Sequence, residues 1–363
     1  SGASTPTGDQ RERLIEVIEA GIVLLWPLIY RGQGRRAAIL AVVIANLADR
    51  LDDRDYALPY AALGETCRQL GLARFARIYT ARARQALDRD VCFIEFGATA
   101  RIFIQAEAGH GRWSRARRLV ERALDCSERV GDRRGYEGLL CTRALVELTR
   151  GPDARIETIA RRLDTLSEQS GNPLAALWNN VIWMLLAYQR DDLGAALDHA
   201  ASVSADRLID ALPVTRCHLL SVEAACLARR GEFDCAFGIA WRAFEHFEAL
   251  TEGGDVNFFL LHSYRALAEA CYHCGVADAE SAYQPARALD LFDDVVDRLG
   301  NLAKRFPAAR PALLRNRGRK AALKGDTAAA SALYSQSLRQ ARRLDMPFDD
   351  KLTRRAAARL GGQ

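Results

Sequence analysis

Turn-forming residues recur every forty residues through the first two thirds of the chain. Gly71, Gly111, Gly151 and Gly231 belong to this series, and Asp191 fills its remaining position. A fixed period between about 20 and 50 residues is typical of stacked repeats, in which no single unit can bury its apolar face alone. The spacing therefore predicts one continuous array of repeats rather than separate globular domains.

Each repeat contains two helical patterns joined by a tight turn. The clearest copy spans residues 229–243 and has its turn at Gly231, followed by small residues at Ala236, Ala240 and Ala243. Because these alanines are four and three residues apart, they share one face of a helix, where a neighbouring helix can pack closely. A low proline content, ten in 363 residues, favours helix throughout. The repeat unit is therefore predicted to be a helix–turn–helix hairpin.

The order of small and aromatic residues within a unit is similar to that of a tetratricopeptide repeat (TPR). Tyr60 and Gly64 precede the turn at Gly71, and Phe75 and Ala76 follow it. The forty-residue form resembles degenerate helical repeats in the C-terminal part of large bacterial signalling ATPases, namely maltose-activator-like regulators and ATPase–cyclase or ATPase–kinase fusions. The resemblance covers almost the whole chain. With the period, it implies an all-α, right-handed superhelical solenoid of about eight helix–turn–helix (TPR-like) repeats.

The repeats divide the chain into three segments. Residues 1–8 are expected to be a disordered lead or tag remnant, and the absence of an initiating Met predicts a piece of a larger protein. Residues 9–250 hold regular hairpins with the forty-residue period. Residues 251–363 are predicted to be irregular repeats with a turn at Gly275, a long helix over 278–306 and a polar terminal helix that caps the array.

The first hairpin is more apolar than an end repeat should be, because end repeats of a solenoid normally present a polar outer face. Large exposed apolar patches usually mark contact sites. One alternative is a well-buried first repeat. The other is a contact through residues 14–47 with an upstream domain of the same polypeptide or, as a homodimer, with a second copy. The large apolar residues in question are Leu24, Leu25, Trp26, Ile39 and Val43.

The charge distribution argues against nucleic acid as a partner. The net charge of +5 is mild for 363 residues and is spread among carboxylates, whereas nucleic-acid-binding proteins gather cations into a patch or stripe. A membrane is not expected either. The most apolar run, Ala20–Tyr30, is too short to cross a bilayer and contains Pro27.

The nine cysteines lie within helical patterns rather than at loop spacings. Disulfide frameworks belong to short secreted chains, so these cysteines are interpreted as small buried hydrophobes in a reducing, cytoplasmic compartment. Cys271, His273 and Cys274, with His262 nearby, form the one cluster with metal-ligand chemistry. Zinc needs a closed set of four ligands, and no second Cys or His pair completes it. We therefore predict neither a structural metal nor a disulfide.

No motif of a catalytic or cofactor site is present in the sequence. The glycine-containing stretch Arg31–Arg35 lacks the Lys-Ser/Thr of a phosphate-binding loop and follows a predicted helix. Neither G-x-S-x-G nor H-E-x-x-H occurs, and the six histidines are scattered. The sequence therefore predicts a non-enzymatic protein without a cofactor.

In a TPR-like array, the first helix of each hairpin lines the concave surface. Counting back from each turn places polar, aromatic and basic residues on this wall. Guanidinium groups suit carboxylates or phosphates, and aromatic rings offer stacking faces. The register therefore predicts a groove for an acidic peptide or protein, or for a small anionic ligand, although each residue alone could equally serve packing or solvation. The predicted groove residues are Arg68, Arg101, Gln105, Trp178, Tyr188, His218, Arg265, Arg315 and Arg319, with Arg229, Glu269, Tyr272 and His273 in the same register.

The resemblance and the groove together predict a protein- or ligand-binding regulatory module. Its expected context is the sensor or scaffold region of a bacterial multidomain signalling or transcription-regulating ATPase. The alternative is a freestanding TPR adaptor that recruits a partner enzyme. What is encoded upstream of residue 9 distinguishes the two.

Overall fold

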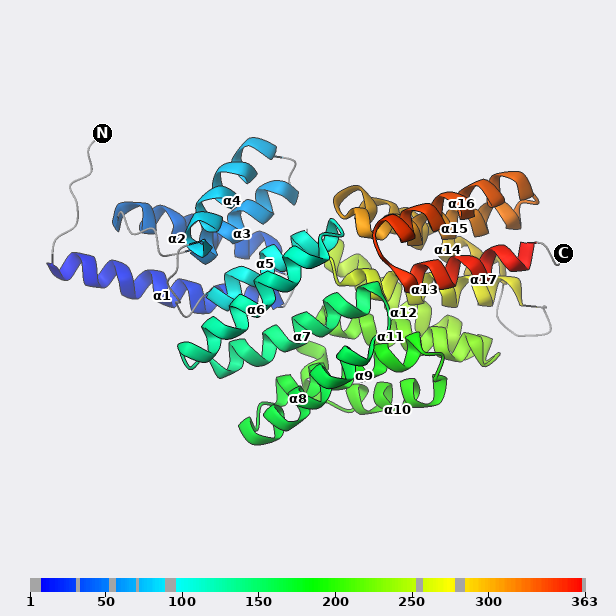
Figure 1. The fold of residues 1–363 in the computed structure, drawn as a ribbon, viewed down its shortest axis with the longest axis horizontal. Coiled ribbons are helices and arrows are strands. Elements are labelled where there is room, and N and C mark those ends of the chain that lie inside the picture. Colours follow the sequence, from blue (N-terminus) through cyan, green and yellow to red (C-terminus); the bar gives the residue numbers. More distant parts are fainter. Residues whose placement is uncertain are drawn as a thin grey trace.

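The structure is a computed structural model that describes residues 8–30, 33–51, 57–69, 72–88, 96–252, 257–277 and 285–360. Within these ranges all regular structure is helical, and consecutive helices pair into eight antiparallel hairpins (Figure 1). The all-α solenoid of about eight hairpins is thus confirmed, while its handedness stays a prediction. The pairs are α1 (Gly8–Tyr30) with α2 (Gly34–Leu51), α3 (Ala57–Gln69) with α4 (Ala73–Leu87), α5 (Phe96–Gly109) with α6 (Trp113–Arg129), α7 (Arg133–Arg150) with α8 (Ala154–Ser170), α9 (Pro173–Gln189) with α10 (Leu193–Ser204), α11 (Pro213–Arg229) with α12 (Phe233–Glu252), α13 (Leu260–Val276) with α14 (Pro285–Arg305), and α15 (Arg310–Leu323) with α16 (Thr327–Arg343).

Three further elements occur among the described residues. Two 3-10 turns, η1 (Arg207–Ala211) and η2 (Pro307–Ala309), lead into α11 and α15. A single helix, α17 (Pro347–Leu360), follows the last hairpin.

The turns of the forty-residue series join the two helices of a hairpin, as predicted. Gly111 and Gly231 adopt φ of 74° and 83°, the left-handed region that glycine tolerates without strain. Gly71 lies outside the described residues. Gly275 does not form a turn but lies inside α13, where a Cβ would collide with Leu289 of α14. Its lack of a side chain therefore serves close packing between helices.

The hairpins form two layers. The first helices make an inner layer that is most deeply buried in the later repeats, where every residue of α13 from Leu260 to Cys271 is buried. The second helices make an outer layer with one buried stripe each, such as Ala236, Ala240 and Ala243 of α12. Because a helix with a single apolar stripe packs on one side only, the polar faces of the outer helices remain in water.

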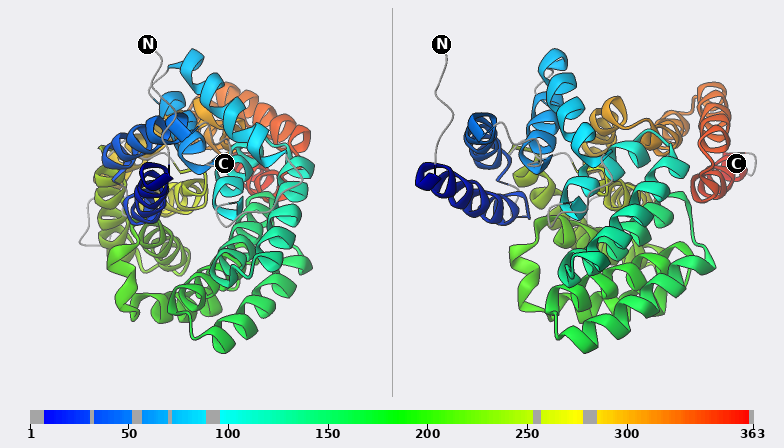
Figure 2. Two further views of the ribbon diagram at one scale, coloured as in Figure 1. Left: turned by 90° about the vertical axis from the view of Figure 1, so that its left-hand side faces the viewer. Right: turned by 60° about the vertical axis from the view of Figure 1, so that its left-hand side comes forward.

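The array curves until its C-terminal hairpins meet its middle ones, so that the helices follow one another around a ring in an end-on view (Figure 2). Helix α17 contacts α7, and η2 contacts α5. The indole Nε1 of Trp113 donates to the carbonyl of Leu344, across more than half of the chain. The inner layer of the middle and C-terminal repeats is therefore partly covered by other parts of the same chain.

The first hairpin exposes several large apolar side chains on both of its helices. Leu24 is 59% exposed, Ile39 67% and Val43 49%. Leu25 is fully buried, and the side chain of Trp26 lies outside the described residues. Among the helices that the structure describes, none combines the length and apolarity that a bilayer crossing requires.

Candidate functional site

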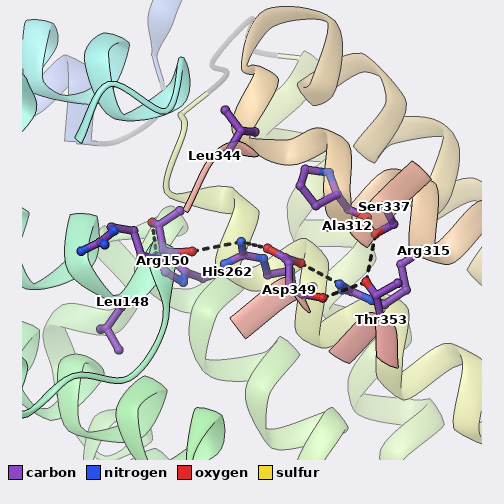
Figure 3. Close-up of polar contacts among 12 residues, drawn as sticks. Leu148, Arg150, His262, Ala312, Arg315, Ser337, Leu344, Asp349 and Thr353 are labelled. Carbon is purple, nitrogen blue, oxygen red and sulfur yellow. Dashed lines mark hydrogen bonds and ion pairs between the residues drawn. The ribbon is translucent and has the colours of Figure 1, made fainter. Parts of the chain in front are cut away.

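A buried carboxylate, Asp349, connects helix α17 to other repeats (Figure 3). Asp349, in the first turn of α17, accepts hydrogen bonds from Arg265 Nη2 of α13 and from Arg315 Nη1 of α15, the latter at 2.6 Å. None of these side chains is more than 1% exposed. Arg265 Nη2 also donates to the carbonyl of Thr149 at the end of α7, at 3.1 Å. This cluster fixes α17 against α7, α13 and α15.

Two neutral histidines lie next to this cluster. His262 Nε2 is 3.1 Å from Thr149 Oγ1, and His218 Nδ1 is 2.6 Å from Ser263 Oγ. Burial lowers the pKa of His218 to about 4. Burial, together with the charge of Arg265, holds the pKa of His262 well below its usual value. Both rings therefore act as uncharged hydrogen-bonding groups at neutral pH.

A cavity of about 550 Å³ lies beside the Asp349 cluster. We call it the basic pocket. Its walls are the α9–α10 turn, the end of α11, one face of α13, Arg319 of α15 and one face of α17. Five arginines line it, against the two carboxylates Asp191 and Glu269. The pocket therefore carries an excess of positive charge, contributed by helices that are far apart in the sequence.

Both carboxylates of the basic pocket are already engaged by the protein. Asp191 accepts from Arg355 at 2.8 Å, Lys351 at 2.9 Å and Arg229 at 2.9 Å. The hydrogen bond from Arg355 is the largest reason why the pKa of Asp191 lies well below its usual value, since burial alone would raise it. Asp191 therefore stays ionised and connects α17 to α11.

Glu269, on the α13 side of the basic pocket, is also held by hydrogen bonds from neighbouring side chains. It accepts from Arg229 Nη2 at 2.7 Å and from the hydroxyl of Tyr188 at 2.8 Å. Burial would raise the pKa of Glu269, but Arg229, His273 and Arg319 outweigh burial and keep that pKa well below its usual value. Glu269 is thus a buried, ionised carboxylate whose acceptor positions are largely occupied.

Arg319 is a buried pocket arginine that has no hydrogen bond to a carboxylate among the described residues. It is 6% exposed, and Glu269 acts on it through charge. Its Nη1 donates to Asn316 Oδ1 at 3.2 Å, and its guanidinium lies 4.6 Å from the centre of the Tyr272 ring. Its buried Nε has no hydrogen-bond acceptor within the described residues.

The predicted groove residues separate into two groups. Tyr188, His218, Arg265, Arg315 and Arg319 are buried, between 1% and 6% exposed. The structure brings them together around Glu269 and Asp349, where all except Arg319 act inside the protein. These residues are buried because the C-terminal helices α13, α15 and α17 pack over the inner face of the array. In an open solenoid the same face would be in contact with water.

The other four remain at least partly exposed on first helices of the earlier repeats. Arg68 of α3 is paired with Glu65 at 2.5 Å. Arg101 of α5 and Trp178 of α9 meet at Gly138 of α7, where a Cβ would lie 2.8 Å from Arg101 Nη1 and 3.5 Å from Trp178 Cζ3. The fourth is Gln105, half-buried on α5.

Sequence reasoning missed Asp349 and Asp191 as site residues. Asp191 did carry a signal, since it stands where the other turns of the series have glycine and adopts φ of 67°. A non-glycine residue with positive φ is uncommon and worth examining. Asp349 carried no such signal, because its partners are 34 and 84 residues away.

The prediction for the cysteines needs one correction. Cys126 is disulfide-bonded, so the prediction of no disulfide is wrong there. Its partner lies outside the described residues, because the other described cysteines, including Cys271 and Cys274, are free thiols. Disulfide formation depends on the separation of two Cβ atoms, which a helical repeat pattern does not determine. Among the described residues, no group of three or more His, Cys, Asp or Glu side chains is arranged to hold a metal.

Comparisons with known proteins do not assign this chain to a family. No protein-family model matches the chain, and no curated protein matches it. Among solved structures, the crystal structure of the P58(IPK) TPR domain is similar at 12% sequence identity, covering 94% of this chain and 98% of that chain, with a TM-score of 0.25. With so low a TM-score, the description of the chain as a helical-repeat solenoid rests on its own hairpins.

Proposed function

We propose that this chain is a non-enzymatic binding and regulatory module whose partner is a protein or peptide bearing acidic groups. The observation that carries the proposal is the division of the inner layer. The C-terminal half covers its own first helices, whereas the earlier repeats leave Arg68, Arg101, Gln105 and Trp178 accessible. Guanidinium, amide and indole groups on the first helices α3, α5 and α9 suit an extended acidic segment.

The test is binding of a fluorescent Glu-rich peptide, with a Gln-rich peptide of equal length as the uncharged comparison. Exposed ion pairs contribute only about 0–1 kcal/mol each, so affinity should depend on several arginines and fall with salt. Arg68→Ala combined with Arg101→Ala should weaken binding without lowering the melting temperature. The matched control is Arg74→Ala with Arg77→Ala, two exposed residues of the outer helix α4. Equal binding by both double variants would contradict the proposal.

The proposed context is the sensor or scaffold region of a bacterial multidomain signalling ATPase, in the cytoplasm. A freestanding adaptor that recruits a partner enzyme is the second candidate. Reading the gene upstream of residue 9 separates them. A nucleotide-binding or cyclase domain in that position supports the sensor, and a start codon supports the adaptor.

A second contact surface is proposed on the first hairpin. Helix α1 buries Ile18, Ile22 and Leu25 on one side, yet Leu24 is exposed on another, and α2 likewise exposes Ile39 and Val43. Two apolar faces are what an internal repeat of a solenoid needs, because it packs against a neighbour on each side. We therefore propose that residues 14–47 contact a second copy or an upstream domain.

A further inference from the structure

We propose that the basic pocket is a second, separate binding site, which takes a small phosphate monoester with an aromatic or apolar body and whose occupancy holds α17 in place. Neither Arg68 nor Arg101 lines this pocket. The inference therefore goes beyond peptide binding by the earlier repeats and can fail independently of it.

The charge of the basic pocket favours an anion. Asp191 and Glu269 are both committed to Arg229, and Asp191 also to Arg355 and Lys351. They leave Arg319 without a hydrogen-bonded carboxylate, and Arg359 faces the pocket from an exposed position on α17. Arginine binds phosphate oxygens through paired N–H donors, so these two groups can clamp one phosphate between α15 and α17.

The buried guanidinium of Arg319 adds to the preference of the pocket for an anion. A buried polar group without a partner is costly, more so when it carries charge. Arg319 Nε has no acceptor among the described residues, although the side chain is 6% exposed and lines the pocket. An anion in the pocket would offset the positive charge of Arg319, which a neutral compound of the same shape cannot do.

The remaining walls describe the rest of the ligand. Phe233 and Tyr272 contribute aromatic surface, and Leu193 and Leu352 contribute aliphatic surface. The cavity of about 550 Å³ falls in the range of small-molecule sites, about 300–1,000 Å³. A phosphate attached to a ring system therefore fits better than inorganic phosphate alone.

Occupancy would also strengthen the docking of α17. This helix reaches the pocket through Leu352, Arg355, Ala356 and Arg359, while the opposite walls belong to α11, α13 and α15. A molecule held by both Arg359 and Arg319 connects α17 to the inner layer. Because a ligand stabilises the state that binds it, ligand concentration would control how firmly the ring is closed.

The experiment measures binding of AMP by calorimetry and by the shift in melting temperature. Adenosine supplies the body without the phosphate, inorganic phosphate supplies the anion alone, and succinate supplies carboxylates. AMP should bind and raise the melting temperature, adenosine should do neither, and both phosphate and succinate should bind more weakly than AMP. Binding should weaken as salt is added, because the interaction is between charges.

Two variants and one control place the ligand in the basic pocket. Arg359→Ala should weaken AMP binding about tenfold or more, since it removes a charge-assisted hydrogen bond. Arg319→Gln should do the same. If that buried substitution prevents folding, as circular dichroism would show, Arg359→Ala decides alone. The control is Arg354→Ala on the same helix, because Arg354 pairs with Asp350 outside the pocket.

Amide hydrogen exchange tests the coupling to α17. When AMP is added, amide hydrogen exchange should slow throughout α17 and stay unchanged in the first hairpin. The proposal is overturned if none of the probes binds at millimolar concentration. It is equally overturned if binding is the same in Arg359→Ala as in Arg354→Ala, or if AMP binds without slowing exchange in α17.

Discussion

At the scale of single residues, two adjacent aspartates on α17 have opposite roles. Asp349 is fully buried between Arg265 and Arg315, whereas Asp350 pairs with Arg342 and Arg354, both about 60% exposed. Removing one partner of a buried ion pair leaves the other charge uncompensated and costs about 3–5 kcal/mol. Asp349→Asn should therefore lower the free energy of unfolding by about that amount in urea titrations.

Asp350→Asn is the matched control for this prediction. The chemical change is the same one position later, but an exposed pair contributes about 0–1 kcal/mol. Equal losses of stability in the two variants would show that Asp349 is not the anchor of α17 described above.

The buried histidines predict a loss of stability in mild acid. The folded pKa of His218 is about 4, below the usual unfolded value of about 6.5, so the unfolded chain binds more protons between these pH values. Stability therefore falls as pH decreases from about 6.5 towards 4, by up to about 3 kcal/mol for His218 alone. His262, whose pKa is also lowered, adds to the effect.

Urea unfolding at pH 7 and pH 5 checks this prediction. His218→Gln with His262→Gln removes both titrating groups and should reduce the difference between the two pH values. An unchanged pH dependence in the double variant would assign acid sensitivity to other groups.

At the scale of elements, ring closure depends on close packing of a glycine backbone against a side chain from a distant repeat. A Cβ at Gly109, the last residue of α5, would collide with the ring of Phe306 just before η2. Gly109→Ala forces one of these elements to move, and overpacking of this kind costs about 1–3 kcal/mol. We expect thermal unfolding to shift to lower temperature in this variant.

Gly238→Ala in α12 provides the comparison. No atom lies within 4 Å of a Cβ at that helical position, so alanine should be neutral or should stabilise by about 0.5–1 kcal/mol. Similar destabilisation by both substitutions would show that contact with Phe306 does not govern the response.

The sequence predicted the helical hairpins and their turns, but it did not predict which hairpins contact one another across the ring. The forty-residue spacing located the turns at Gly111, Asp191 and Gly231, because each repeat imposes its own local geometry. It could not place Arg265 or Arg315, since their burial depends on helices that arrive from a distant part of the chain. The repeat period reflects packing between neighbouring hairpins. It contains no information on contacts between hairpins that are several repeats apart.

At the scale of the whole molecule, the first hairpin predicts association. Leu24, Ile39 and Val43 are exposed together on the end repeat. Leu24→Glu with Ile39→Glu should convert a dimer or larger species to monomer in sedimentation experiments, without loss of helical content. Wild-type protein that sediments as a monomer at high concentration would refute contact between copies and leave an upstream domain as the proposed occupant.

The contact of Trp113 with Leu344, at the end of α16, and that of Arg265 with Asp349, in α17, make the C-terminal helices a necessary part of the middle of the molecule. An open solenoid gains stability repeat by repeat as it is synthesised, since each unit needs only its neighbour. This chain cannot complete its inner layer until α17 has left the ribosome. Contacts that are distant in sequence form slowly, and apolar surface that is exposed in the meantime favours aggregation. The growing polypeptide is therefore expected to depend on chaperones for the whole interval between the synthesis of α7 and that of α17.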